Sequence, residues 1–155
     1  MNEKMELLTE ERIVEFSNFV GKVFDEFVAK DYSPLGNATF HDFIRVEEIR
    51  KRFRNGNFYL IYVIDGQIAG AVELRDRKHI CLLFVDAKYQ RKGIATRLFS
   101  EVKAHIKSKE PEIKAIEVNS SPYAKDIYKN LGFTEKSGLK EQNGIKYYEL
   151  EYEIE

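Results

Sequence analysis

The pattern of hydrophobic and polar residues changes its period in the middle of the chain. Residues 80–85 are consecutively apolar (Ile-Cys-Leu-Leu-Phe-Val), a run too short to span a membrane. Such a run predicts a β-strand that is buried on both faces in the middle of a sheet. After a polar turn over 86–92, apolar residues recur every four positions from Ile94 to Ile106, which predicts an amphipathic helix. The expected order is therefore buried strand, basic turn and helix.

Two helices are expected on the N-terminal side of this unit. Thr9 can cap a helix whose apolar face runs from Ile13 to Phe27, and a second helix is expected over 39–55. The segment 31–38 between them is rich in turn-forming residues. Tyr32, in this segment, is the best candidate there for lining a pocket.

A β-hairpin is expected before the central apolar run. Residues 58–64 and 67–75 are rich in β-forming side chains and flank Asp65-Gly66, a strong signal for a two-residue hairpin turn. Strict alternation along the second strand puts Ile68 and Glu73 on opposite faces of the sheet.

The C-terminal part of the chain completes a mixed sheet. A strand over 113–119 follows the central helix and should pair in parallel with the central apolar run, because strand-helix-strand units do so. A short helix over 121–131 and a terminal hairpin of 133–142 and 145–153 come next. The expected fold class is α/β, as one domain over residues 1–155: a mixed sheet flanked by helices, with antiparallel strands on the N-terminal side and one parallel pair.

Composition and charge are those of an ordinary globular domain. Hydrophobic residues make up 43% of the 155 residues, charged residues 33%, and the net charge is −1. The 25 Lys and Arg residues are scattered, so no nucleic-acid partner is expected. The absence of an apolar leader or membrane-length stretch predicts a cytoplasmic protein with no membrane partner. Cys81 lies in the apolar run and is expected to pack, and no metal site is expected because the His and Cys residues lack ligand spacing.

The turn before the central helix has the features of an anion site. The first turn of a helix leaves backbone N–H groups without partners, and residues 90–93 (Gln-Arg-Lys-Gly) offer no good capping side chain. The positive end of the helix dipole and the side chains of Arg91 and Lys92 meet there, and Gly93 has no Cβ to keep a ligand away. On these features alone, a phosphate site and an ordinary turn with solvated cations both remain open.

Two motifs resemble one known family. The order Gln90-Arg91-Lys92-Gly93-Ile94-Ala95 resembles the Gln/Arg-x-x-Gly-x-Gly/Ala signature of the GNAT superfamily of N-acetyltransferases. The second motif has Asn119, then Ala124-x-x-x-Tyr128-x-x-x-Gly132-Phe133, and is similar to a later GNAT signature. The resemblance covers the chain from about Phe58 to its end.

The resemblance implies an enzyme that transfers an acetyl group from acetyl-coenzyme A (acetyl-CoA) to an amine by direct attack. The turn would hold the pyrophosphate. The strand before it would offer its backbone to the pantetheine arm, because the parallel pair to which this strand belongs splays apart after Val85. The cofactor-binding residues that it implies are Leu83, Phe84, Val85, Gln90, Arg91, Lys92, Gly93, Ile94, Ala95, Thr96, Asn119 and Tyr128.

The same resemblance makes Tyr128 the expected general acid for the departing thiolate, because a phenol stays protonated at neutral pH. Its alternative role is core packing. For the general base, Glu73 is the first candidate and Glu117 the second, since small and apolar neighbours can raise the pKa of Glu73. For either glutamate, a solvated carboxylate with water as the proton carrier remains an equal alternative.

The sequence indicates only the general kind of acceptor and of oligomeric state. The acceptor is expected to be a small-molecule or peptide amine, and the protein a monomer or homodimer. The alternative function is a non-catalytic module that binds coenzyme A for regulation or interaction. Turnover with any amine would distinguish the enzyme from the module.

Overall fold

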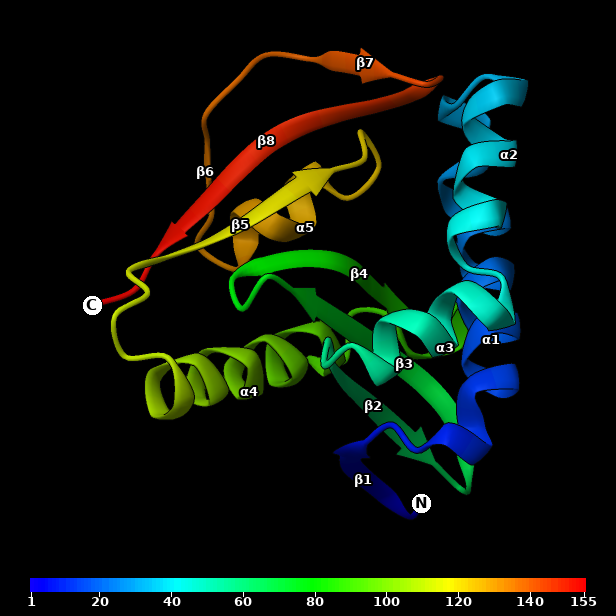
Figure 1. Cartoon of the computed structure of the whole chain (residues 1–155), viewed down its shortest axis with the longest axis vertical. Helices are drawn as coiled ribbons and strands as arrows, with labels where there is room; N and C mark the ends of the chain where they lie inside the picture. The colour runs from blue at the N-terminus through cyan, green and yellow to red at the C-terminus, as the bar shows by residue number, and fades with distance from the viewer.

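An eight-stranded mixed β-sheet runs through the centre of the computed structural model, which describes residues 1–155 (Figure 1). The strands are β1 (Glu3–Leu7), β2 (Phe58–Ile64), β3 (Gln67–Arg75), β4 (His79–Val85), β5 (Ala115–Ser120), β6 (Thr134–Glu135), β7 (Lys140–Gln142) and β8 (Ile145–Glu153). They lie in the order β1-β2-β3-β4-β5-β8-β6, with β7 paired to β8. All neighbours are antiparallel except β4 and β5, which are parallel. The predicted fold class is confirmed.

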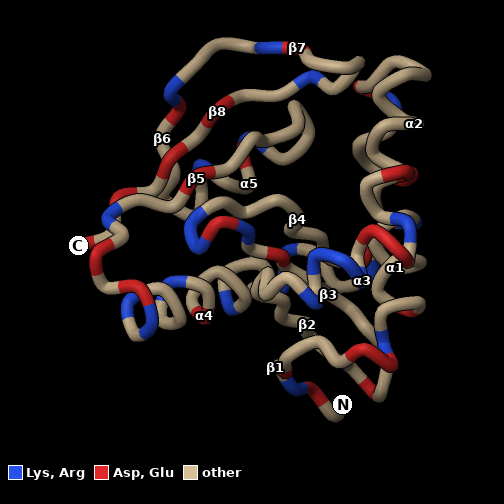
Figure 2. The backbone as a smooth tube through the Cα atoms, in the orientation of Figure 1, with Lys and Arg blue, Asp and Glu red and all other residues tan.

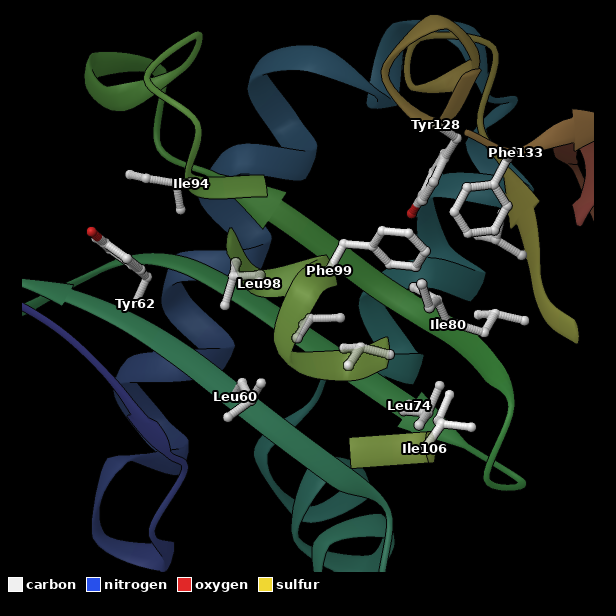
Figure 3. Packing of buried hydrophobic residues seen from close by; sticks show 14 of the residues in the cluster. Leu60, Tyr62, Leu74, Ile80, Ile94, Leu98, Phe99, Ile106, Tyr128 and Phe133 are labelled. Carbon is white, nitrogen blue, oxygen red and sulfur yellow. The ribbon is translucent and has the colours of Figure 1, made fainter. Parts of the chain in front are cut away.

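Helices cover both faces of this sheet. They are α1 (Ile13–Phe27), α2 (Pro34–Phe43), α3 (Val46–Arg54), α4 (Ile94–Lys109) and α5 (Lys125–Asn130). On one face, Leu98 and Phe99 of α4 join Tyr128 of α5 in a cluster on the sheet (Figure 3). On the other face, Phe16 of α1 and Ile49 of α3 belong to a second cluster. None of the helices is long and apolar enough to cross a membrane.

The N-terminal third differs from the prediction. The single helix expected over 39–55 is two helices, α2 and α3, and α2 begins already at Pro34. Ser33 caps α2, since its Oγ accepts a hydrogen bond from the backbone N–H of Gly36 at 3.1 Å, and proline suits the first helical position. Thr9 makes no capping hydrogen bond, because the 3₁₀ turn Glu10–Arg12 stands before α1. No pattern in the sequence predicted β1, which pairs with β2 at the edge of the sheet.

The C-terminal prediction was correct in outline. Asn143 and Gly144 have positive φ angles of 53° and 79° and form the turn of the terminal hairpin. The strand expected over 133–142 is divided into β6 and β7. The hairpin turn packs on α2, because a Cβ on Gly36 would overlap the carbonyl of Gly144. This contact joins the helical N-terminal part of the chain to its last strands (Figure 1).

A β-bulge in β3 changes which side chains share a face. Tyr62 is opposite Gly70 but Val63 is opposite Ile68, so Ala69 is an extra residue in the ladder. Ile68 consequently lies in the same hydrophobic cluster as Ala71 on the α1 face. The expectation that Ile68 and Glu73 face opposite sides is therefore wrong.

The parallel pairing of β4 and β5 is short. Only His79 with Glu117 and Ile80 with Val118 are in register. Cys81 is an extra residue between the pairs that join β4 to β3, and such a bulge bends its strand. The two strands therefore separate after Ile80, and not after Val85 as the sequence analysis expected. This early divergence opens the space in which the candidate site lies.

Candidate active site

The main cavity of the molecule, about 480 Å³ in volume, lies between the diverging ends of β4 and β5. The turn before α4 lines it together with residues of α1, α2, β4 and β5. Of the cofactor-binding residues predicted from the sequence, those that line it are Leu83, Phe84, Val85, Gln90, Arg91, Gly93, Ile94, Ala95, Thr96, Asn119 and Tyr128. Lys92 and Glu73 do not line the cavity.

The turn before α4 presents unpaired backbone N–H groups. From Gln90 to Thr96, no backbone N–H donates to a protein acceptor, and Gly93 at the helix start provides no capping side chain. Arg91 and Gly93 have φ angles of 65° and 84°, in the left-handed region that only glycine adopts without strain. Alternation of this kind points successive N–H groups into one concavity that binds anions, and the helix dipole adds to it. The geometry favours the phosphate site over the ordinary turn.

Close packing on β3 holds the start of α4 in place. A Cβ on Gly70 would lie 2.8 Å from Cγ2 of Ile94 and 3.2 Å from Cδ1 of Leu98. The first turn of α4 therefore rests directly on the β3 backbone at a position where only glycine fits. The alternation of residues along β3 does not predict this requirement for glycine at position 70, because the side chains that crowd Gly70 come from a helix distant in the sequence.

Two of the basic residues near the turn have different surroundings. Arg97 Nη1 donates to the carbonyl of Lys92 and to the hydroxyl of Tyr62, both at 3.4 Å, so Arg97 ties the turn to β2. The Lys92 side chain is exposed, with its ammonium 5.9 Å from the ring centroid of Tyr89. Lys92 can therefore reach an anion only from the outer side of the turn.

Tyr128 extends from α5 into the cavity. Its ring is 5% exposed and packs edge-on against Phe133 at 5.3 Å, while its hydroxyl points toward β4 (Figure 3). The hydroxyl donates to no protein acceptor, so it is free to bond a ligand in the cavity. Burial raises the pKa of Tyr128, with smaller contributions from Cys81 and Tyr32. The phenol therefore stays protonated at neutral pH.

Tyr32 and Cys81 are two further polar groups in the cavity wall. Tyr32 lines the cavity, as its place in the turn-rich segment suggested, and burial with the nearby charge of Asp31 raises its pKa to about 12. The Cys81 thiol lies 3.7 Å from the carbonyl of Glu73, and burial followed by the charge of Glu73 raises its pKa. A neutral thiol is a poor nucleophile, so Cys81 serves as part of the wall.

The side chain of Glu73 lies on the α3 side of β3 and does not line the cavity. It is fully buried and accepts hydrogen bonds from Arg52 Nε at 2.7 Å and from Asn57 Nδ2 at 2.9 Å. This placement does not favour Glu73 as the general base, because its carboxylate is bonded to Arg52 of α3 and does not line the cavity. Glu117 also lies outside the cavity, within 3.5 Å of Lys78 and 3.6 Å of His79.

A comparison with models of known families identifies the class of enzyme as an acetyl-CoA-dependent N-acetyltransferase. A family model described as "Acetyltransferase (GNAT) domain" matches residues 28–154, and the chain belongs to the GNAT family. No curated protein sequence matches the chain.

Solved structures share the whole fold at low sequence identity. A GCN5-related N-acetyltransferase from Rhodopseudomonas palustris has a TM-score of 0.84 at 16% identity, over 99% of this chain and 97% of that one. The PaiA N-acetyltransferase from Thermoplasma acidophilum, in complex with coenzyme A, has a TM-score of 0.80 at 16% identity, over 99% and 100%. An aminoglycoside 6′-N-acetyltransferase complexed with coenzyme A has a TM-score of 0.67 at 10% identity, over 97% and 96%.

Proposed function

We propose that the cavity between β4 and β5 holds acetyl-CoA, with the pyrophosphate at the turn before α4. The observation that carries this proposal is the row of unpaired N–H groups from Gln90 to Thr96 around the left-handed Gly93. The amides of the pantetheine arm would complete the backbone groups of β4 that lose their β5 partner after Ile80. Asn119, on the opposite wall, is positioned to bond the same arm.

The chemistry is transfer of the acetyl group from sulfur to the nitrogen of an amine that enters from the α1 and α2 side. Tyr128 is the proposed general acid, since it lines the cavity and its hydroxyl has no protein partner. It donates its proton to the sulfur as the C–S bond breaks, and solvent returns a proton to the phenol.

Water takes the proton that the amine loses. No Asp, Glu or His side chain lines the cavity, and Arg91 is the one charged side chain that does. A neutral amine is needed for attack, whereas a simple alkylammonium has a pKa of about 10.4. The ionisation of the acceptor itself, and not that of a protein base, therefore controls how much reactive amine is present.

This mechanism predicts a pH profile with only a rising limb. With an alkylamine acceptor, kcat/KM should increase about tenfold per pH unit from about pH 7 to 9, because the neutral amine fraction does so. The pKa of Tyr32 is raised to about 12 and that of Tyr128 is also raised, so neither phenol ionises in this range and no falling limb is expected. The rise should end in a plateau above the pKa of the amine, so an amine with a lower pKa should reach its plateau at a lower pH. A plateau at the same pH for both acceptors would instead identify a protein base.

Substitution of Gly93 tests the phosphate site. Asp and Asn both tolerate the left-handed conformation and have nearly the same size, so the pair isolates the effect of a negative charge. Gly93→Asp should bind coenzyme A at least tenfold more weakly than Gly93→Asn, about 1.4 kcal/mol by calorimetry. Both substitutions strain the same left-handed position, so Gly93→Asp and Gly93→Asn should have similar thermal stability and differ mainly in affinity. Equal affinities in the two folded variants would place the phosphate elsewhere.

A further inference from the structure

One wall of the cavity is aromatic and aliphatic. It is made by Val23 and Phe24 of α1, by Val28 directly after α1, by Phe40 of α2 and by Phe84 of β4. The rings of Phe24 and Phe40 are stacked, with centroids 4.0 Å apart and planes inclined by 9°. Phe84 lies edge-on to Phe40, with centroids 6.1 Å apart. These rings therefore form a continuous aromatic cluster in the lining of the cavity.

No charged side chain of α1, α2 or β4 lines the cavity, and the His41–Asp25 pair, whose imidazole packs edge-on to Phe24, is not part of the lining. Figure 2 shows Lys, Arg, Asp and Glu on the helices, on the turns and on strands such as β1 and β8, whereas β4 carries none. Arg91, the one charged residue that lines the cavity, belongs to the turn before α4. Asp31, the neighbour of Tyr32 in the sequence, does not line the cavity. The hydroxyls of Tyr32 and Tyr128 are among the uncharged polar groups in the lining.

A second charge on the acceptor would be costly in such a place. Transfer of an ion from water to a protein interior costs several kcal/mol unless an opposite charge pairs with it. The cavity lining has no carboxylate to pair with a second ammonium group, and its one cation, Arg91, belongs to the turn that is proposed to hold the pyrophosphate. An apolar or aromatic group, by contrast, gains from burial against the wall.

We propose that the acceptor is a primary amine that carries one aromatic or aliphatic group and no second charged centre. This proposal rests on the proposed function, because it concerns the amine that enters the same cavity. In the reaction a C–N bond forms, the C–S bond breaks, the amine loses one proton and the thiolate gains one.

Matched acceptors test this with the unaltered enzyme, by measuring the thiol released from acetyl-CoA. Pentylamine and 1,4-diaminobutane have the same number of heavy atoms, but the diamine ends in a second ammonium group. Phenylethylamine and phenylalanine differ by a carboxylate. We expect kcat/KM to be at least tenfold higher for pentylamine than for the diamine, and at least tenfold higher for phenylethylamine than for phenylalanine. Phenylethylamine should also exceed ethylamine, because only phenylethylamine reaches the aromatic wall.

Phe40 provides a second, independent readout. Phe40→Ala removes part of the stacked wall, so the ratio of kcat/KM for phenylethylamine over ethylamine should fall at least fivefold. Phe40→Leu keeps an apolar side chain there and should retain more of this ratio. A purely structural role for Phe40 would lower both values together and leave the ratio unchanged, which would count against the proposal.

The outcomes separate this proposal from the proposed function. If coenzyme A binds and diamines or amino acids are acetylated faster than their uncharged partners, the acceptor assignment is overturned and the function stands. If coenzyme A binds but none of the monoamines is acetylated, the acceptor assignment is also overturned. If coenzyme A does not bind in calorimetry, the proposed function itself fails.

Discussion

Tyr128→Phe should lower the turnover number about 100-fold, the usual size of a general-acid contribution, and leave the affinity for coenzyme A nearly unchanged. The hydroxyl donates to no protein acceptor, so its removal breaks no hydrogen bond in the free enzyme. What it removes is an interaction made mainly in the transition state, which lowers kcat and kcat/KM together. The measurement is steady-state acetylation of the best amine acceptor, with thermal unfolding of the same preparation.

Tyr152→Phe is the matched control. Tyr152 lies in the same hydrophobic core, 5.7 Å from Phe133 between ring centroids, but its hydroxyl accepts from Lys103 at 3.4 Å on the α4 side. It does not line the cavity, so its loss should not change turnover. If Tyr128→Phe instead lowered thermal stability and kept normal turnover per folded molecule, with chemistry rate-limiting, Tyr128 would be a packing residue.

Arg52→Met should destabilise the protein by about 3–5 kcal/mol, because it leaves the carboxylate of Glu73 buried without its charged partner. Glu73 is fully buried, and Arg52 binds it through Nε at 2.7 Å and Nη2 at 3.3 Å. Arg52 also donates to the carbonyl of Phe43 at 2.8 Å, so it connects α2, α3 and β3. Chemical denaturation gives the free energy of unfolding directly.

Two further variants separate the buried charge from general damage to α3. The double variant Arg52→Met with Glu73→Gln removes both charges and should be more stable than Arg52→Met alone, since no unpaired ion remains. On the same helix, Arg54 pairs with Glu10 at 3.0 Å, but both side chains are largely exposed. Arg54→Met should therefore change the unfolding free energy little. Equal losses at Arg52 and Arg54 would contradict the special role of the buried pair.

The amino-acid sequence by itself determined the features that depend on local chemistry. The uniform apolar run gave the central strand, and the change to a helical period at Ile94 gave the start of α4 where the structure has it. Asp65-Gly66 and Asn143-Gly144 form the two predicted hairpin turns, with positive φ angles at all four residues. The free N–H groups before α4 follow from the missing cap, because a helix start is a local property.

Only the tertiary structure decided which side chains face the cavity. The bulges at Ala69 and Cys81 shift the strand faces and end the parallel ladder early, and no local periodicity reports them. The environment of Glu73 depends on Arg52, which belongs to another element, so its candidacy as a base was decided by packing. Burial and partners depend on contacts between segments that are distant along the chain, whereas turns and periods depend on neighbours, and this is why the two kinds of feature differ in predictability.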